Sequence, residues 1–140
     1  QVVCAVAYQG RVACFNMIDG SQIWAREASS NVGLSMDNDY IYVSEDKGVV
    51  VAYSKQSGAS IWKQSRLGSK KLSAPLVRDH LIAVGDDKGN VTLLRNYDGA
   101  VMARAATGES AIITAPVSLP DGFLVQAMDG GLYAFSTTQF

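Results

Sequence analysis

The 140-residue sequence is poor in cysteine, proline and histidine, with two, three and one of these residues. Two cysteines, Cys4 and Cys14, are too few for a disulfide framework, and no histidine or further cysteine stands at metal-ligand spacing from them. The single histidine, His80, has no serine or cysteine nucleophile in a context that would make it a general base, so we expect a solvated turn residue. The sequence therefore predicts no catalytic residue, no metal site and no bound cofactor.

Neither sign of charge is in excess, because 12 basic residues stand against 13 acidic ones. Without a basic field the protein cannot hold nucleic acid or an anionic bilayer by counterion release, so we expect no nucleic-acid partner. No stretch approaches the roughly eighteen apolar residues of a membrane span, and residues 1–7 lack the features of a signal peptide. We expect any targeting or lipid-attachment signal to lie upstream of Gln1.

Glycine, in contrast, recurs at regular intervals. Four glycines, each between two apolar runs, are separated by 38, 41 and 41 residues: Gly10, Gly48, Gly89 and Gly130. A second glycine follows ten residues later in three of these units, at Gly20, Gly58 and Gly99. Glycine supplies a positive φ at no steric cost, so the first set predicts hairpin turns between β-strands.

The runs between the glycines are short and rich in β-branched and aromatic residues. One unit contains three such runs, 40–44, 49–53 and 61–64, and a further run precedes each set, marked in two units by Pro75 and Pro116. Proline is tolerated where a strand begins, because its missing N–H is not needed there. Four short antiparallel strands in each repeat of about forty residues are typical of a β-propeller blade. We therefore predict an all-β fold built from four-stranded antiparallel propeller blades.

The expected strands divide the chain into four blades of a single partial propeller domain, residues 1–140. Residues 2–28 are expected to hold three strands, 31–66 four, 72–106 four and 112–136 three. About three and a half blades cannot close a ring, and their open sides would expose apolar faces. We therefore expect the C-terminal part of a larger propeller, and we expect the fragment by itself to self-associate.

A more specific pattern lies in each unit and is clearest in residues 52–62. It resembles the tryptophan-docking repeat of quinoprotein-type propellers. The resemblance implies that Trp24 and Trp62 pack between neighbouring blades rather than stack on a ligand, and the size of the indole agrees with that role. Ala103 stands where the third unit would place its tryptophan.

Several stretches also resemble the C-terminal part of the BamB family, which are propeller lipoproteins of the bacterial outer-membrane β-barrel assembly machinery. The stretches are 7–12, 20–24, 72–77 and 125–130, and the resemblance extends over nearly the whole chain. It implies an eight-bladed periplasmic propeller, attached to the inner face of the outer membrane by an N-terminal lipid absent from this chain. It also implies a non-catalytic scaffold that binds the periplasmic domains of the barrel-forming subunit, with the main contact segment upstream of Gln1.

Two alternatives share the same repeat. One is a fragment of a quinoprotein dehydrogenase, which uses pyrroloquinoline quinone and calcium, and the other is a different periplasmic sensor propeller of bacteria. In alcohol-oxidising members the dehydrogenase carries a disulfide between adjacent cysteines, and this sequence has no adjacent pair. The scaffold is therefore the preferred hypothesis, since fold by itself does not settle function.

The preferred docking candidate is the segment that joins the second and third units. It gathers Arg66, Leu67, Lys70 and Lys71 in a loop on the rim or face of the propeller, where an acidic partner could meet it. The alternative interpretation, which is preferred for a charge run of this kind, is a merely solvated segment.

Two further pairs need an interpretation. Cys4 and Cys14 face each other across a predicted hairpin, at positions that are apolar in the other units, so two reduced core thiols are preferred over a cross-strand disulfide. The adjacent acids 45–46 and 86–87 point to opposite faces of a strand, so we expect solvated turn residues rather than a joint site.

Overall fold

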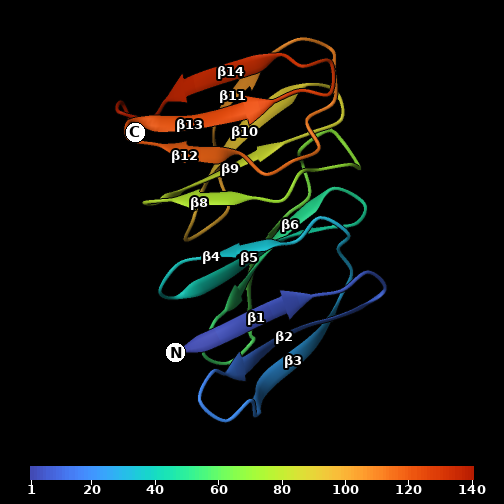
Figure 1. Cartoon of the computed structure of the whole chain (residues 1–140), viewed down its shortest axis with the longest axis vertical. Helices are drawn as coiled ribbons and strands as arrows, with labels where there is room; N and C mark the ends of the chain where they lie inside the picture. The colour runs from blue at the N-terminus through green and yellow to red at the C-terminus, as the bar shows by residue number, and fades with distance from the viewer.

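The computed structural model describes residues 1–140 as fourteen β-strands without a helix. Four antiparallel sheets, of three, four, four and three strands, follow one another along the chain. Figure 1 shows them stacked along the long axis of the molecule, from the N-terminal to the C-terminal end. The predicted all-β, propeller-type fold is confirmed, and the chain has no helix that could span a membrane.

The strands of each sheet are consecutive in the chain, so each sheet is one blade. The first blade contains β1 (Val2–Val6), β2 (Gly10–Asn16) and β3 (Gln22–Ala28). The second contains β4 (Leu34–Met36), β5 (Tyr40–Glu45), β6 (Val49–Ser54) and β7 (Ser60–Gln64). The third contains β8 (Leu76–Arg78), β9 (Leu81–Gly85), β10 (Asn90–Arg95) and β11 (Val101–Ala106). The fourth contains β12 (Val117–Leu119), β13 (Gly122–Gln126) and β14 (Leu132–Ser136).

The blades share one register. Equivalent pairs across the hairpin are Cys4 with Cys14, Tyr42 with Ala52, Ala83 with Leu93 and Leu124 with Ala134. Because side chains alternate along a strand, each blade presents one apolar face to the blade before it and one to the blade after it. Three separate core clusters result, one in each space between neighbouring blades.

The two outermost faces of the stack have no neighbour within the chain. Val3 on the first blade is 51% exposed, and Leu132 on the last blade is 62% exposed. Inner faces of the same blades are covered, as Val12 at 0% and Phe123 at 1% show. The stack therefore ends in two open apolar faces.

The hairpin glycines meet a steric requirement at one position in particular. Gly48 has φ 79°, and a Cβ there would come 1.8 Å from the carbonyl oxygen of Ser69 in the following linker. No other residue fits so close to that backbone. The first hairpin differs, because Gln9 instead of Gly10 has the positive φ, at 48°.

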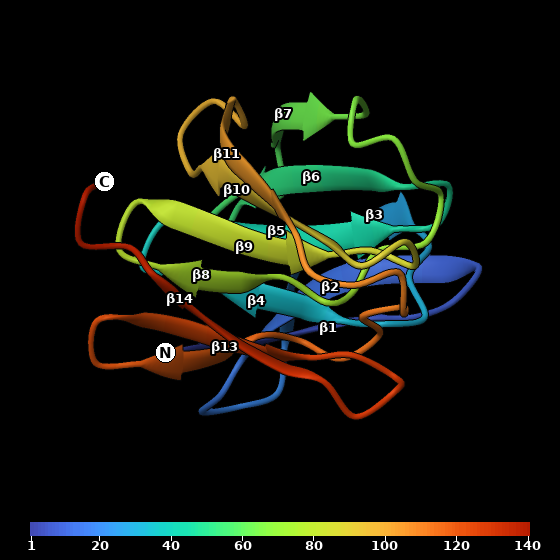
Figure 2. The ribbon, with the colours of Figure 1, turned by 90° about the horizontal axis from the view of Figure 1, so that it is seen from above.

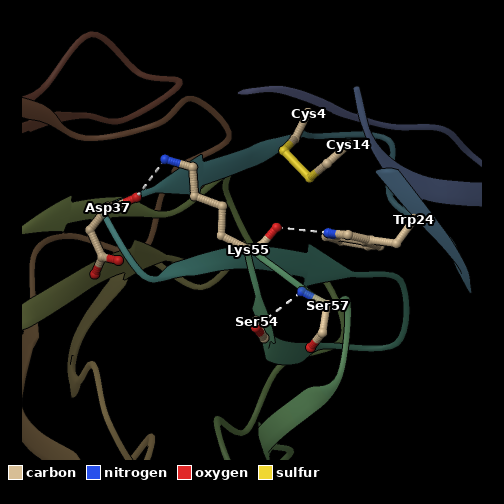
Figure 3. Close-up of a disulfide and its surroundings, with 7 residues drawn as sticks. All are labelled: Cys4, Cys14, Trp24, Asp37, Ser54, Lys55 and Ser57. Atoms are coloured by element: carbon tan, nitrogen blue, oxygen red, sulfur yellow. Dashed lines mark hydrogen bonds between the residues drawn. A yellow bond between two sulfur atoms is a disulfide. The ribbon is translucent and has the colours of Figure 1, made fainter. Parts of the chain in front are cut away.

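The structure corrects the expectation of two free thiols. Cys4 and Cys14 form a disulfide that joins β1 to β2, as Figure 3 shows. They are direct register partners with Cα atoms 4.1 Å apart, within reach of one disulfide in a closely spaced antiparallel pair. A disulfide is as apolar as the side chains at the equivalent positions of other blades, so the sequence pattern did not distinguish it from two thiols.

Candidate docking groove

The repeat tryptophans join neighbouring blades. The Nε1 of Trp24 in the first blade donates a hydrogen bond of 2.8 Å to the carbonyl of Lys55 in the second, as drawn in Figure 3. Trp62 of the second blade repeats this contact with the carbonyl of Asn96 in the third, also at 2.8 Å. Each indole thus buries its ring and still satisfies its N–H.

The second glycine of each repeat makes room for these rings. A Cβ on Gly58 would lie 2.5 Å from the ring of Trp24, and one on Gly99 would lie 2.3 Å from the ring of Trp62. Gly20 in the first blade has a similar φ of 75°, but no atom lies within 4 Å of its Cβ position. Tryptophan and glycine therefore act as a complementary pair across two interfaces between blades.

The third interface reverses this pair. Ala103 takes the position of the tryptophan, and Phe140 takes the position of the glycine, ten residues after Gly130. Both side chains pack against the same core cluster between the third and fourth blades. The large ring therefore comes from the following blade, and the small residue from the preceding one.

The β1–β2, β5–β6 and β9–β10 hairpins gather at one end of the molecule, at the right of Figure 2. With the linkers between blades they enclose a groove of about 940 Å³. Its lining includes Tyr8 from the β1–β2 hairpin, Lys47 from the β5–β6 hairpin and Ile113 from the linker that enters the fourth blade. We call this feature the docking groove.

The structure divides the predicted docking residues. Lys70 and Lys71 line the docking groove, whereas Arg66 is exposed outside it. Leu67 is 1% exposed and belongs to the core between the second and third blades, so its assignment to a docking surface is wrong. The basic residues around Leu67 suggested that it contacts a partner, but its side chain fills the core beneath the loop.

The carboxylates of the docking groove are already hydrogen-bonded within its walls. Asp46 accepts a hydrogen bond from the hydroxyl of Ser29, and Asp87 accepts one of 2.5 Å from the hydroxyl of Ser69. Glu45 accepts one of 3.2 Å from the hydroxyl of Tyr53. Burial, followed by the charge of Glu45, raises the pKa of Tyr53 to about 12.

The lysines of the docking groove are free of such contacts. The ion pairs of the chain are Arg95–Asp98 and Arg104–Asp86, and neither involves Lys47, Lys70 or Lys71. All three lysines are exposed. The charges of the lining are balanced, because Glu45, Asp46 and Asp87 keep their negative charge while they accept these hydrogen bonds.

Ser44 lies in the same wall and has an unusual environment. It is 1% exposed, and its Oγ is the single buried side-chain oxygen or nitrogen without a hydrogen-bond partner. A desolvated hydroxyl without a partner costs about 1–3 kcal/mol. Unsatisfied groups of this kind mark places where a structure is not optimised for stability alone.

Asp86 corrects a second expectation, that the paired acids are solvated. Its side chain is 4% exposed and accepts hydrogen bonds from the backbone N–H groups of Lys88, at 2.9 Å, and Asn90, at 3.0 Å. Arg104 lies 3.7 Å away. Asp86 thus closes the β9–β10 turn, a local role that its position before Lys88 and Gly89 could have indicated.

A polar cluster at the opposite end of the blades connects the second blade to the third. Asp37 accepts hydrogen bonds from the hydroxyl of Tyr42 at 2.6 Å, the N–H of Tyr40 at 2.8 Å and the amide of Asn96 at 3.4 Å. Burial acts to raise the pKa of Asp37, but these hydrogen bonds together hold it below the usual value of 3.8. The cluster is a structural joint, and no group of three or more potential metal ligands occurs in the chain.

Sequence reasoning missed Tyr8, Lys47 and Ile113 as members of the docking groove. The expected docking site was a continuous charged segment, whereas the groove is assembled from six separate parts of the chain. A usable signal was the large apolar residue at a hairpin or linker position, since Tyr8 is 59% exposed and Ile113 is 55% exposed.

Comparison with known proteins links the chain to one family. The family model described as outer membrane protein assembly factor BamB matches residues 1–64 and 46–139. A BamB of Nitrosomonas eutropha is 51% identical over 135 residues, which are 96% of this chain and 33% of that protein. The crystal structure of BamB from Moraxella catarrhalis superposes with a TM-score of 0.88 at 29% identity, over 96% of this chain and 40% of that one.

Other propellers share the fold alone. A quinohemoprotein alcohol dehydrogenase from Pseudomonas putida HK5 matches with a TM-score of 0.76 over 90% of this chain and 27% of that one, but at 14% identity. The chain spans about a third of the length of the curated relatives it matches.

Proposed function

This chain belongs to the BamB family, and from that membership we propose that the protein carrying it is a non-catalytic scaffold in the assembly of outer-membrane proteins. The observation that carries the proposal is the 51% identity to a protein named outer membrane protein assembly factor, extending over 96% of the chain. Identity at this level over four consecutive blades includes surface loops as well as the core. The similarity therefore supports a shared role and not only a shared fold.

The proposal has a specific partner and location. The protein binds the periplasmic domains of the barrel-forming subunit of the assembly machinery, and an N-terminal lipid outside this chain attaches it to the inner face of the outer membrane. The Cys4–Cys14 disulfide supports the location, because disulfides persist in oxidising compartments such as the bacterial periplasm. The docking groove is the surface of this chain best suited to contact a partner.

The dehydrogenase alternative is supported by fold similarity alone. The cysteines of this chain are paired with each other at a sequence separation of 10, which is not the adjacent-cysteine disulfide of the alcohol-oxidising enzymes. The likeness to one such enzyme, at 14% identity, carries no argument for its chemistry. We therefore retain the scaffold as the proposed function.

Affinity purification of the full-length protein from envelope extract tests the proposal. We expect the barrel-forming subunit to co-purify, and we expect deletion of the protein to lower the amount of folded outer-membrane barrels. If no subunit of the assembly machinery co-purifies, the proposed scaffold function is contradicted. A calcium-dependent quinone absorption band in the purified protein would replace it with the dehydrogenase.

A further inference from the structure

We infer that the two open faces of the stack fit each other, so that a second copy of this chain docks head to tail and closes the ring. The inference concerns the chain by itself and does not rest on the proposed function. It is carried by the equivalence of the open faces to the covered ones, by their lack of charge and by the length of the stack relative to a whole propeller.

The open face of the first blade has the same positions as the covered faces that follow it. Register places Val3 at the position of Ile41 in the second blade and of Phe123 in the fourth. Ile41 and Phe123 are buried because a preceding blade covers them, whereas Val3 is half exposed. Phe15 on β2 likewise takes the position of the buried Tyr53. We call this surface the front face.

The open face of the last blade matches the opposite set of covered faces. Register places Leu132 at the position of Val12 in the first blade and of Val50 in the second. Both valines are fully buried, whereas Leu132 is more than half exposed. We call this surface the back face. The front face and the back face lie at the two ends of the stack in Figure 1.

A front-type face meets a back-type face at every interface within the chain. Between the first and second blades, Val12 and Ile41 belong to one core cluster. The equivalent pair on the open ends is Leu132 with Val3, so these two side chains meet when a second copy continues the stack. The strands that carry the two faces, β1 and β2 at one end and β13 and β14 at the other, are all present in the chain. The contact therefore resembles a domain core divided between two chains.

The two faces have no charge to keep them in water. Arg11, near the beginning of β2, lies beyond the apolar set of the front face. Exposed apolar surfaces of this kind mark interaction sites in soluble proteins. The front face consists of Val3, Ala5, Ala13 and Phe15, and the back face of Leu124, Leu132 and Ala134, with the uncharged Gln126 beside them.

The length of the stack indicates how many copies close the ring. The BamB chain of Moraxella catarrhalis is about 2.4 times as long as this chain, since 96% of this chain covers 40% of that one. At about forty residues for each blade, that chain has room for about eight blades. Four sheets in the present chain are therefore about half of a ring.

Two computationally designed proteins show the same proportion. The stack superposes on 84% of one of them and on 42% of the other, with TM-scores of 0.82 and 0.80, over 96% of this chain in both cases. At 14% identity these likenesses show the fold alone. The same stack of blades is thus most of one chain and a little under half of another that is about twice as long.

Two half rings cover all their open faces at once. A half turn about the propeller axis brings the front face of each copy onto the back face of the other, so the head-to-tail contact occurs twice and the assembly closes. A contact whose rotation did not close would add copies without limit. The expected product is therefore a closed dimer.

Sedimentation velocity and native mass spectrometry of the chain test the inference. We expect a species of twice the 14.9 kDa mass that does not grow further as the concentration rises. Val3→Lys and Leu132→Glu each place a charge in both contacts of the dimer. Each variant alone is expected to raise the dissociation constant of the dimer about tenfold or more.

Val101→Lys is the matched control, because Val101 is an apolar residue of similar exposure on β11 of the third blade, away from both open faces. Its dissociation constant is expected to stay within about twofold of that of the unaltered chain. Circular dichroism verifies that all three variants keep their β-structure, as substitutions at exposed positions should.

A mixture of the two disrupting variants tests the head-to-tail arrangement. One contact then brings the introduced lysine against the introduced glutamate, and the other contact keeps the original Val3 and Leu132. We expect the dimer to return, with one copy of each variant. A mixture that stays monomeric, or disruption by only one of the two variants, overturns the inference, since the latter result means front-to-front or back-to-back docking. A monomeric unaltered chain, or assemblies that keep growing with concentration, overturns it as well.

Discussion

The ring of Trp24 lies so close to Gly58 that a Cβ on this glycine would stand 2.5 Å from the indole carbon Cε3. The two residues belong to different blades, and the same relationship recurs between Trp62 and Gly99. The contact between two blades therefore needs a large ring on one blade and a glycine on the next. Substitution of the glycine tests this contact directly.

Gly58→Ala is predicted to destabilise the chain by about 3 kcal/mol, since it adds a steric clash to the cost of alanine in the left-handed region. Gly20→Ala is the matched control. Its φ is also 75°, but nothing lies within 4 Å of its Cβ position, so we expect a loss of about 1 kcal/mol. Urea unfolding followed by tryptophan fluorescence measures both values, and equal losses would show that the contact with Trp24 does not matter.

The reversed pair at the third interface predicts non-additive substitutions. Ala103→Trp alone is expected to cost about 1–3 kcal/mol by overpacking, and Phe140→Gly alone about 2 kcal/mol by loss of apolar burial. The double variant recreates the tryptophan–glycine arrangement of the other interfaces. We expect it to be more stable than the sum of the single losses by about 1 kcal/mol or more. Additive losses in a denaturant-based double-mutant cycle would show that Ala103 and Phe140 do not compensate each other.

Reduction of the Cys4–Cys14 disulfide is predicted to lower the free energy of unfolding by about 2–3 kcal/mol, because the bond closes a short loop in the unfolded chain. Urea unfolding with and without dithiothreitol measures the loss, and mass spectrometry reports the state of the thiols. The variant Cys4→Ala/Cys14→Ala serves as the control and should not respond to reductant. Free thiols in protein purified from the periplasm would contradict the disulfide.

Asp37 predicts a pH dependence of stability. Its hydrogen bonds outweigh burial and hold its pKa below the usual 3.8 in the folded chain, so the unfolded chain binds the proton more tightly. The resulting stabilisation is complete above the unfolded-state pKa and is lost as pH falls through the lower folded-state value. Urea unfolding from pH 6 down to about pH 3 should therefore show a steeper loss for the unaltered chain than for Asp37→Asn. Identical slopes would remove Asp37 as a source of the effect.

The open faces of the first and last blades predict self-association of the isolated chain. Sedimentation velocity should detect species larger than the 14.9 kDa monomer. Leu132→Lys places a charge on the open face of the last blade and is expected to shift the population toward monomer. Ile61→Lys, on an exposed strand position of the second blade, is the control and should leave the distribution unchanged. A monomer at all concentrations for the unaltered chain would contradict the prediction.

Most of the strand framework could be predicted from the sequence, because local chemistry determines it. Expected runs such as 40–44 and 49–53 agree with β5 and β6 to within one residue at each end. Pro75 and Pro116 stand directly before β8 and β12, as a residue without an N–H does most easily. Glycine spacing and strand periodicity are properties of neighbouring residues, so no distant contact was needed to find them.

The candidate site could not be found in the same way. Leu67 reads as an exposed member of a basic loop and is buried, and Asp86 reads as a solvated turn acid and is buried too. For Leu67 a contact outside the local segment decides the environment, namely the core between two blades. Asp86 is held by the backbone N–H groups of Lys88 and Asn90, a local arrangement that its place before Lys88 and Gly89 could have indicated. The cysteine pair shows the same limit, since its register predicted proximity but not oxidation.

By itself, then, the sequence determined the repeat, the blade type, the pairing of strands and the family, since each depends on residue spacing within about forty positions. Only the tertiary structure decided which lysines remain free of ion pairs, which apolar residues stay exposed beside them and where the docking groove lies. The physical reason is that the groove joins Tyr8 of the first blade to Ile113 of the linker that enters the fourth, and their distance is set by how the blades stack. The blades are held together by contacts between a tryptophan ring and a glycine, such as Trp24 with Gly58. The sequence shows both residues, but only the fold shows that they touch.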